Sequence, residues 1–145
     1  TPFPNYYTPI HTWHILLKYI LLLYHDVVRD GISQQKCLSA LQNNDEPQLD
    51  HGACVVLEFK SPGGVLDSCG LDPGKYGSFL RSEYGTILDF RTAEFLGEAE
   101  DGGDSLSKRQ RIQVLPFGDG KHSTFDFYLS KHEDLWLVDV IVAVK

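Results

Sequence analysis

Several carboxylates and tyrosines in the second half of the chain are of the types that carry out acid–base chemistry. Asp89, Asp126 and Asp139 could act as general bases, and Tyr84 and Tyr128 could polarise a substrate oxygen. Asp126 and Tyr128 are two residues apart, so they share one face if their segment is a strand. These residue types would suit an isomerase or a dehydratase if the side chains entered one cavity.

Asp139 is the most distinctive of these residues because it interrupts the apolar run Leu135–Val144. A buried carboxylate destabilises a fold by on the order of several kcal/mol unless it is paired. We expect a nearby arginine or a backbone amide to satisfy it. Asp89 and Arg91 are also two residues apart, which predicts an ion pair on one strand face.

A structural role is the favoured interpretation for these side chains, which would face solvent or bridge neighbouring strands. The sequence therefore assigns no catalytic residue. The alternative, in which a cavity is used for catalysis, would rest on Asp139, Tyr128, Asp89 and Tyr84.

The histidines and cysteines give no sign of a metal site or a cofactor. His11 and His14 are three residues apart and could share a metal on a helix, but we favour helix-surface positions for both. Cys37, Cys54 and Cys69 contain no C-x-x-C pair, so reduced and mostly buried thiols are expected. Motifs of zinc proteases, serine hydrolases and phosphate-binding loops are also missing from the sequence. We expect no metal and no cofactor.

Composition limits the class of partner. With 145 residues, 42% of them hydrophobic, the chain fits one globular domain. A formal charge of −7 argues against nucleic acid, whose phosphates attract an excess of lysine and arginine. The sequence contains no methionine. We therefore expect that a leader or the initiator residue was removed, or that the sequence begins inside a longer chain.

The segment Trp13–Val28 is apolar around nearly its whole circumference if it is helical, so more than one of its faces must be covered. Lys18 and His25–Asp26 interrupt or end it, which makes it too short to span a membrane comfortably. We expect residues 1–31 to form an N-terminal arm and docking helix, and residues 32–145 to form one α+β domain. The expected interface consists of aromatic and aliphatic side chains: Tyr6, Tyr7, Trp13, Leu16, Ile20 and Leu23.

Helix signals dominate the first half of the chain. Thr8–Pro9 predicts the start of a helix that runs to about Arg29, and Ser33 predicts the N-cap of a helix over 34–43. Asp72–Pro73 predicts another N-cap. Between these helices, Ala53–Phe59 is rich in β-branched residues and predicts a strand, and the glycines of Ser61–Gly70 predict a loop.

The second half of the chain has a strand period. Four strands are expected over Thr86–Leu96, Arg109–Phe117, Thr124–Ser130 and Leu135–Val144, the last of them central in the sheet because both its faces are largely apolar. Asp119–Gly120 predicts a tight hairpin. Residues 132–134 would link the last two strands, and the acidic run Glu98–Asp104 would be a loop. The expected fold is α+β, with N-terminal helices packed on a strongly curved antiparallel sheet that encloses a conical cavity.

Five short motifs give the chain a resemblance to a known superfamily. They are Leu41–Asp45 (LQNND), Cys54–Phe59 running into KSPG, Phe79–Tyr84 (FLRSEY), Ile87–Phe90 (ILDF) and Trp136–Val140 (WLVDV). Over about residues 33–144 the chain resembles an uncharacterised family, found in bacteria and plastid-bearing eukaryotes, within the nuclear-transport-factor-2-like superfamily. The apolar segment before residue 31 departs from that pattern. The resemblance implies a cone-shaped fold shared by cavity enzymes, such as ketosteroid isomerase, scytalone dehydratase and polyketide cyclases, and by non-catalytic complex subunits.

Since one fold serves both classes, it does not decide the function. Our first hypothesis is a non-catalytic accessory or assembly subunit of a larger protein complex, docking through residues 1–30. The resemblance and the missing initiator suggest a plastid photosynthetic complex, including the periphery of a membrane complex; otherwise we expect a soluble intracellular protein. The second is a small-molecule-binding protein or an isomerase or dehydratase that uses the cone. The third is a homodimer that exchanges the first helix.

Overall fold

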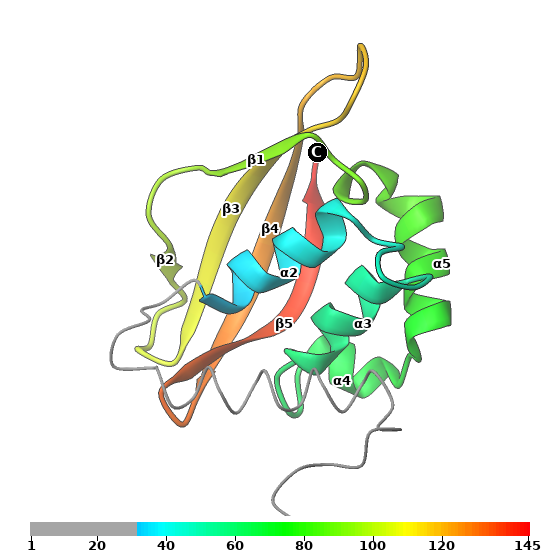
Figure 1. Ribbon diagram of the computed structural model, residues 1–145. Helices are drawn as coiled ribbons and strands as arrows, with labels where there is room; N and C mark the ends of the chain where they lie inside the picture. The colour runs from blue at the N-terminus through cyan, green and yellow to red at the C-terminus, as the bar shows by residue number, and fades with distance from the viewer. Residues whose placement is uncertain (1–31) are drawn as a thin grey trace, which may run out of the picture.

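In the computed structural model, residues 32–145 are described (Figure 1). The expected interface residues, the histidine pair and the first predicted helix lie outside this range. Helices come first: α2 (Ile32–Gln42), α3 (His51–Glu58), α4 (Val65–Cys69), α5 (Pro73–Glu83) and the 3₁₀ helix η1 (Gly85–Ile87). The strands follow: β1 (Thr92–Phe95), β2 (Glu100–Asp101), β3 (Ser107–Leu115), β4 (Ser123–His132) and β5 (Leu135–Val144). The expected α+β class is therefore confirmed.

Local signals place one helix correctly and misplace the start of another. The Asp72 side chain accepts a hydrogen bond from the backbone N–H of Lys75 at 2.8 Å, so it caps α5 as predicted, with Pro73 in the first turn. Ser33, however, lies inside α2 rather than before it. Its hydroxyl donates to the carbonyl of Trp136, which ties α2 to β5 instead of capping the helix.

The prediction of a strand over 53–59 is wrong, because this segment forms α3. Every residue from Gly52 to Leu57 is buried, since α3 packs between α2 and α5. A helix covered on several sides needs no polar stripe, so its β-branched run resembles that of a buried strand. Ser61–Gly70 is not entirely a loop either, since it contains the short helix α4, which Gly70 ends with a φ of 62°.

The five strands form one antiparallel sheet in the order β1-β3-β4-β5, and β2 also pairs with β3. The strand predicted over 86–96 is reduced to β1, because η1 and the positive φ of Asp89 (52°) occupy its first part. β2 lies in the acidic run expected to be a loop. β5 has the predicted bounds but ends the strand order, so among the described strands it lies at the edge of the sheet and not in its centre.

The two hairpins differ from each other. β3 and β4 are joined by residues 116–122, which project from the sheet at the top of Figure 1 and form a longer connection than the tight hairpin expected at Asp119–Gly120. β4 and β5 are joined by Glu133 and Asp134, whose φ angles are both positive (51° and 67°). A two-residue loop of this kind is a type I′ turn.

The helices cover one face of the sheet: α2 crosses in front of β4 and β5, and α3, α4 and α5 lie on the β5 side (Figure 1). The space between the layers is filled by apolar side chains that form one core cluster. Among its largest fully buried members are Tyr76, Phe59, Phe125, Phe127 and Leu41. Aromatic rings thus supply much of the packing between the helices and the sheet.

Candidate functional site

Asp139 lies at an irregularity in the pairing of β4 and β5. Tyr128 pairs with Val140, whereas Leu129 pairs with Val138, so Asp139 is the extra residue of a β-bulge. The bulge shifts the alternation of side chains along β5. Val138 and Ile141 consequently both belong to the buried core, although they are three residues apart. Strict alternation along a strand would place two residues at this spacing on opposite faces.

Both carboxylate oxygens of Asp139 accept hydrogen bonds from serines. The Ser61 hydroxyl donates to Oδ1, and the Ser130 hydroxyl donates to Oδ2 at 2.6 Å. The sequence predicts an arginine or a backbone amide as the partner, and the two serine hydroxyls replace it. Ser61 is 1% exposed, and its N–H donates to the carbonyl of Val138 at 2.8 Å. Lys60 and Val138 form a parallel bridge, so the segment after α3 lies along the outer edge of β5.

Tyr128 and Asp139 line the same hollow, whose volume is about 430 Å³. Because the neighbours of Tyr128 in β4, Phe127 and Leu129, belong to the core, Tyr128 points to the face of the sheet away from the helices. The remaining lining residues come from β2 and the glycine that follows it, from β3 and from β4: Glu100, Asp101, Gly102, Ser107, Lys108, Arg109 and Leu129. The structure thus brings together two of the four residues of the catalytic alternative.

Asp126 is only 4% exposed, and its carboxylate is paired with an arginine. Its two carboxylate oxygens lie 2.9 Å from Nε and 3.0 Å from Nη2 of Arg111, the residue that it faces on β3. This is a bidentate ion pair, which fixes both side chains. Hydrogen bonding to Asp126 and its negative charge raise the pKa of Arg111. In the hollow, Arg109 of β3 pairs with Glu100 of β2 through a single contact between Nη2 and Oε2.

Tyr84 and Asp89 lie elsewhere in the fold. The ring of Tyr84 packs edge-on against Phe125, with centroids 5.7 Å apart, on the helix side of the sheet. Asp89 precedes β1 and is not part of a strand, so the expected strand face with Arg91 does not form. Its Oδ1 accepts the backbone N–H of Asn44 at 3.0 Å and thereby holds the turn after α2.

A polar cluster forms around the Asp50 carboxylate, and no motif in the sequence indicates it. Asp50 is 4% exposed and pairs with Arg81 of α5, and Asn44 Nδ2 donates to the same carboxylate at 3.3 Å. This pairing raises the pKa of Arg81. A Cβ built on Gly77 would lie 2.2 Å from Asp50 Oδ1, so only glycine fits beneath the carboxylate. The one indication of this close packing in the sequence is Gly77 itself, a glycine inside a predicted helix.

The three cysteines, all within residues 32–145, form no disulfide with one another. Cys37 and Cys54 are buried and Cys69 is exposed. Burial raises the pKa of Cys37, and burial together with Glu58 raises that of Cys54, so both favour the neutral form. Within residues 32–145 no group of histidines, cysteines and carboxylates could hold a metal ion. The same part of the chain contains no helix that is long and apolar enough to cross a membrane.

Comparison with protein-family models, with curated proteins and with solved structures gives no match. The resemblance to the nuclear-transport-factor-2-like superfamily therefore stays a prediction.

Proposed function

We propose that the chain is a non-catalytic accessory or assembly subunit of a larger protein complex that docks through residues 1–30. The observation that supports this proposal most directly is the division of the candidate catalytic side chains. Tyr84 packs in the core side of the sheet and Asp89 holds a turn, whereas Tyr128 and Asp139 lie on the opposite face. A single reaction centre would need these groups to converge.

The bonding of these side chains supports the same proposal. Asp139 and Asp126 each have both carboxylate oxygens engaged by side chains of neighbouring segments. These contacts hold strands and loops together, which is the role expected of paired carboxylates in a structural domain. The packing between helices and sheet supports the proposal too. Cavity enzymes of the superfamily that the chain resembles need open space there, whereas aromatic and aliphatic side chains pack together in this region.

Deletion of residues 1–30 tests the docking role. The truncated chain should remain folded, as judged by a cooperative melting transition, and should no longer co-purify with partners from gently solubilised extract of the source organism. A full-length Leu16→Asp/Ile20→Asp variant is the sharper control, because it changes two apolar residues of the expected interface and keeps the full length of the chain. Co-purification that survives both changes would contradict the docking role. An assembly of plastid proteins among the captured partners would place the chain in the compartment that the resemblance suggests.

A second candidate function, small-molecule binding, has one observation in its favour. Tyr128 and Asp139 line the same hollow, and Tyr128 is 39% exposed there. An aromatic ring beside a carboxylate is a typical arrangement for a polar organic ligand. A thermal-shift screen of the full chain against metabolites, repeated with Tyr128→Phe, tests it. A ligand whose stabilisation disappears in the variant would favour this function over the first.

A further inference from the structure

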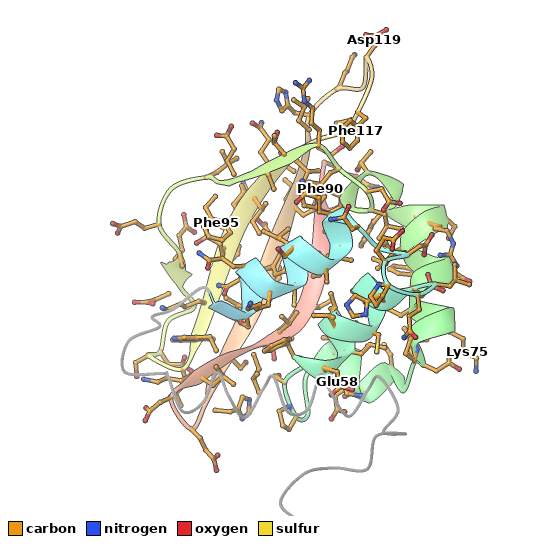
Figure 2. The ribbon with its side chains drawn as sticks, in the orientation of Figure 1. Glu58, Lys75, Phe90, Phe95, Phe117 and Asp119 are labelled. Carbon is orange, nitrogen blue, oxygen red and sulfur yellow. The ribbon has the colours of Figure 1, made fainter. Side chains whose placement is uncertain are left out.

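A groove between α2 and β1 lies apart from the hollow around Asp139. It has a volume of about 290 Å³. Its apolar lining comes from Leu38, Phe90, Ala93 and Phe95, while Gln35, Ser39 and Gln42 of α2 supply a polar wall. In Figure 2, Phe90 and Phe95 both lie on the β1 side of α2. Phe95 is 39% exposed and Leu96, beside it, is 38% exposed, so apolar surface continues beyond the groove.

One wall of this groove is the edge of the sheet. β1 pairs with β3 on one side, and among residues 32–145 no strand pairs with its other side. Alternate backbone N–H and C=O groups of such a strand point outward and can pair with an added strand. At the start of β1, Gln42 Nε2 donates to the carbonyl of Arg91 at 2.8 Å, which fixes α2 beside the strand. The groove is thus held open by a contact within the domain.

The charge around the groove favours one kind of occupant. The fifteen residues 92–106, which form β1, β2 and their surroundings, contain no lysine or arginine and five carboxylates: Glu94, Glu98, Glu100, Asp101 and Asp104. Glu100 is neutralised by Arg109, but Glu94 and Glu98 are exposed. Lysine or arginine in a partner would be attracted to this rim.

We propose that the β1 edge and the groove bind an extended, basic segment of a partner protein, which adds a strand to the sheet. Its apolar residues, at alternate positions, enter the groove between α2 and β1, and its flanking lysines or arginines face Glu94 and Glu98. This mode of recognition takes its affinity from main-chain hydrogen bonds and its specificity from alternate side chains. The proposal rests on the proposed role as an interaction subunit but uses a surface formed by residues 32–145.

The test uses the full chain and the peptide Lys-Lys-Leu-Thr-Val-Thr-Leu-Lys-Lys, with binding followed by NMR. The amide signals of residues 92–95 and the Gln42 side-chain amide should shift on titration. Two N-methylated peptides examine the main-chain bonds: one carries methyl groups on the threonine nitrogens and the other on the leucine and valine nitrogens. Since the N–H groups of a strand alternate between its two edges, one of these peptides should lose binding and the other should keep it.

Substitutions in the chain complete the test. Phe95→Ser should weaken binding by roughly tenfold or more, whereas Phe117→Ser, at another exposed phenylalanine, should leave it unchanged. Glu94→Lys/Glu98→Lys should weaken the lysine-flanked peptide and strengthen a glutamate-flanked version of it. Neither change should affect co-purification that depends on residues 1–30, so failure of this proposal is distinguishable from failure of the docking role.

Three results would overturn the proposal. The first is the absence of shifts in β1 at millimolar peptide. The second is equal binding of both methylated peptides, which would exclude strand addition. The third is binding seen only after residues 1–30 are deleted, which would identify the groove's occupant as this chain's own N-terminal segment.

Discussion

The hydroxyl of Ser61 donates a hydrogen bond to Oδ1 of Asp139 and so joins two residues that are 78 positions apart in the sequence. Ser130, on the neighbouring strand β4, donates to the other oxygen of the same carboxylate. One carboxylate therefore connects β4, the bulge of β5 and the segment that follows α3. Because β5 lies at the edge among the described strands, this contact holds the helical layer against the rim of the sheet.

Removal of the carboxylate should destabilise the fold. Asp139→Ala leaves the buried Ser61 hydroxyl without its acceptor, and we expect the free energy of unfolding to fall by about 1–3 kcal/mol. Ser61→Ala should lower it by about 1 kcal/mol, and the double variant should show a coupling energy of roughly 0.5 kcal/mol or more. Urea unfolding measures all three. Ser82→Ala, at an exposed serine, is the control. Wild-type stability of Asp139→Ala would instead point to a ligand-binding role for this carboxylate.

Two glycines in the same helix should respond in opposite directions to alanine. In α5, a Cβ on Gly77 would lie 2.2 Å from Asp50 Oδ1, whereas on Gly74 the nearest atom would be 3.5 Å away. Gly77→Ala must displace the buried Asp50 carboxylate from its contact with Arg81, so we expect a loss of about 2 kcal/mol or more despite the better helix propensity of alanine. Gly74→Ala should be neutral or stabilising by up to about 1 kcal/mol. Equal thermal stabilities for the two variants would contradict the packing seen beneath Asp50.

The elements with local signals are those that the sequence predicts well. The Asp72–Pro73 cap sets the start of α5, and the strand period of β5 gives its bounds. α3 is missed because its burial comes from α2 and α5, which a local pattern does not contain. The close packing of α3 on α2 requires a glycine at position 52, because a Cβ there would lie 2.6 Å from Asn44 Oδ1 and 2.8 Å from the carbonyl oxygen of Ala40. Tertiary contact thus overrides the β propensity of the segment.

The same limit applies to the candidate site. Alternation along β5 identifies Asp139 as an unusual residue, but its partners, Ser61 and Ser130, depend on the bulge and on the pairing of Lys60 with Val138. Neither is encoded by a motif within β5 itself. The Asp50–Arg81 pair is likewise formed by residues from different helical segments, one of which, Asp50, has a positive φ of 59°. Sequence patterns indicate which residues are unusual, and the fold decides what they contact.

Stability should fall on mild acidification, in part through His51. Burial lowers the pKa of this imidazole in the folded protein. The unfolded chain therefore binds the extra proton more readily, and the stability present above the unfolded pKa of about 6.5 is lost as the pH falls from there through the lower folded pKa. Urea midpoints measured across this range should decline less in His51→Gln than in the wild type. His122→Gln, in the exposed loop 116–122, should retain the wild-type slope. An unchanged slope in His51→Gln would contradict the assignment.

The turn between β4 and β5 offers a stabilising substitution. Glu133 and Asp134 both have positive φ angles, a conformation that is unfavourable for residues with a Cβ and that suits asparagine and glycine in type I′ turns. Asp134→Gly should raise the free energy of unfolding by about 0.5–1 kcal/mol, because backbone strain is relieved and the ion pair that is lost, with the exposed Lys131 3.8 Å away, is weak. Gly118→Ala is the opposite control, since it introduces a Cβ at a φ of 80°, and it should lower the free energy of unfolding by a similar amount. Thermal melts that place Asp134→Gly below the wild type would show that the Lys131 contact outweighs the backbone strain.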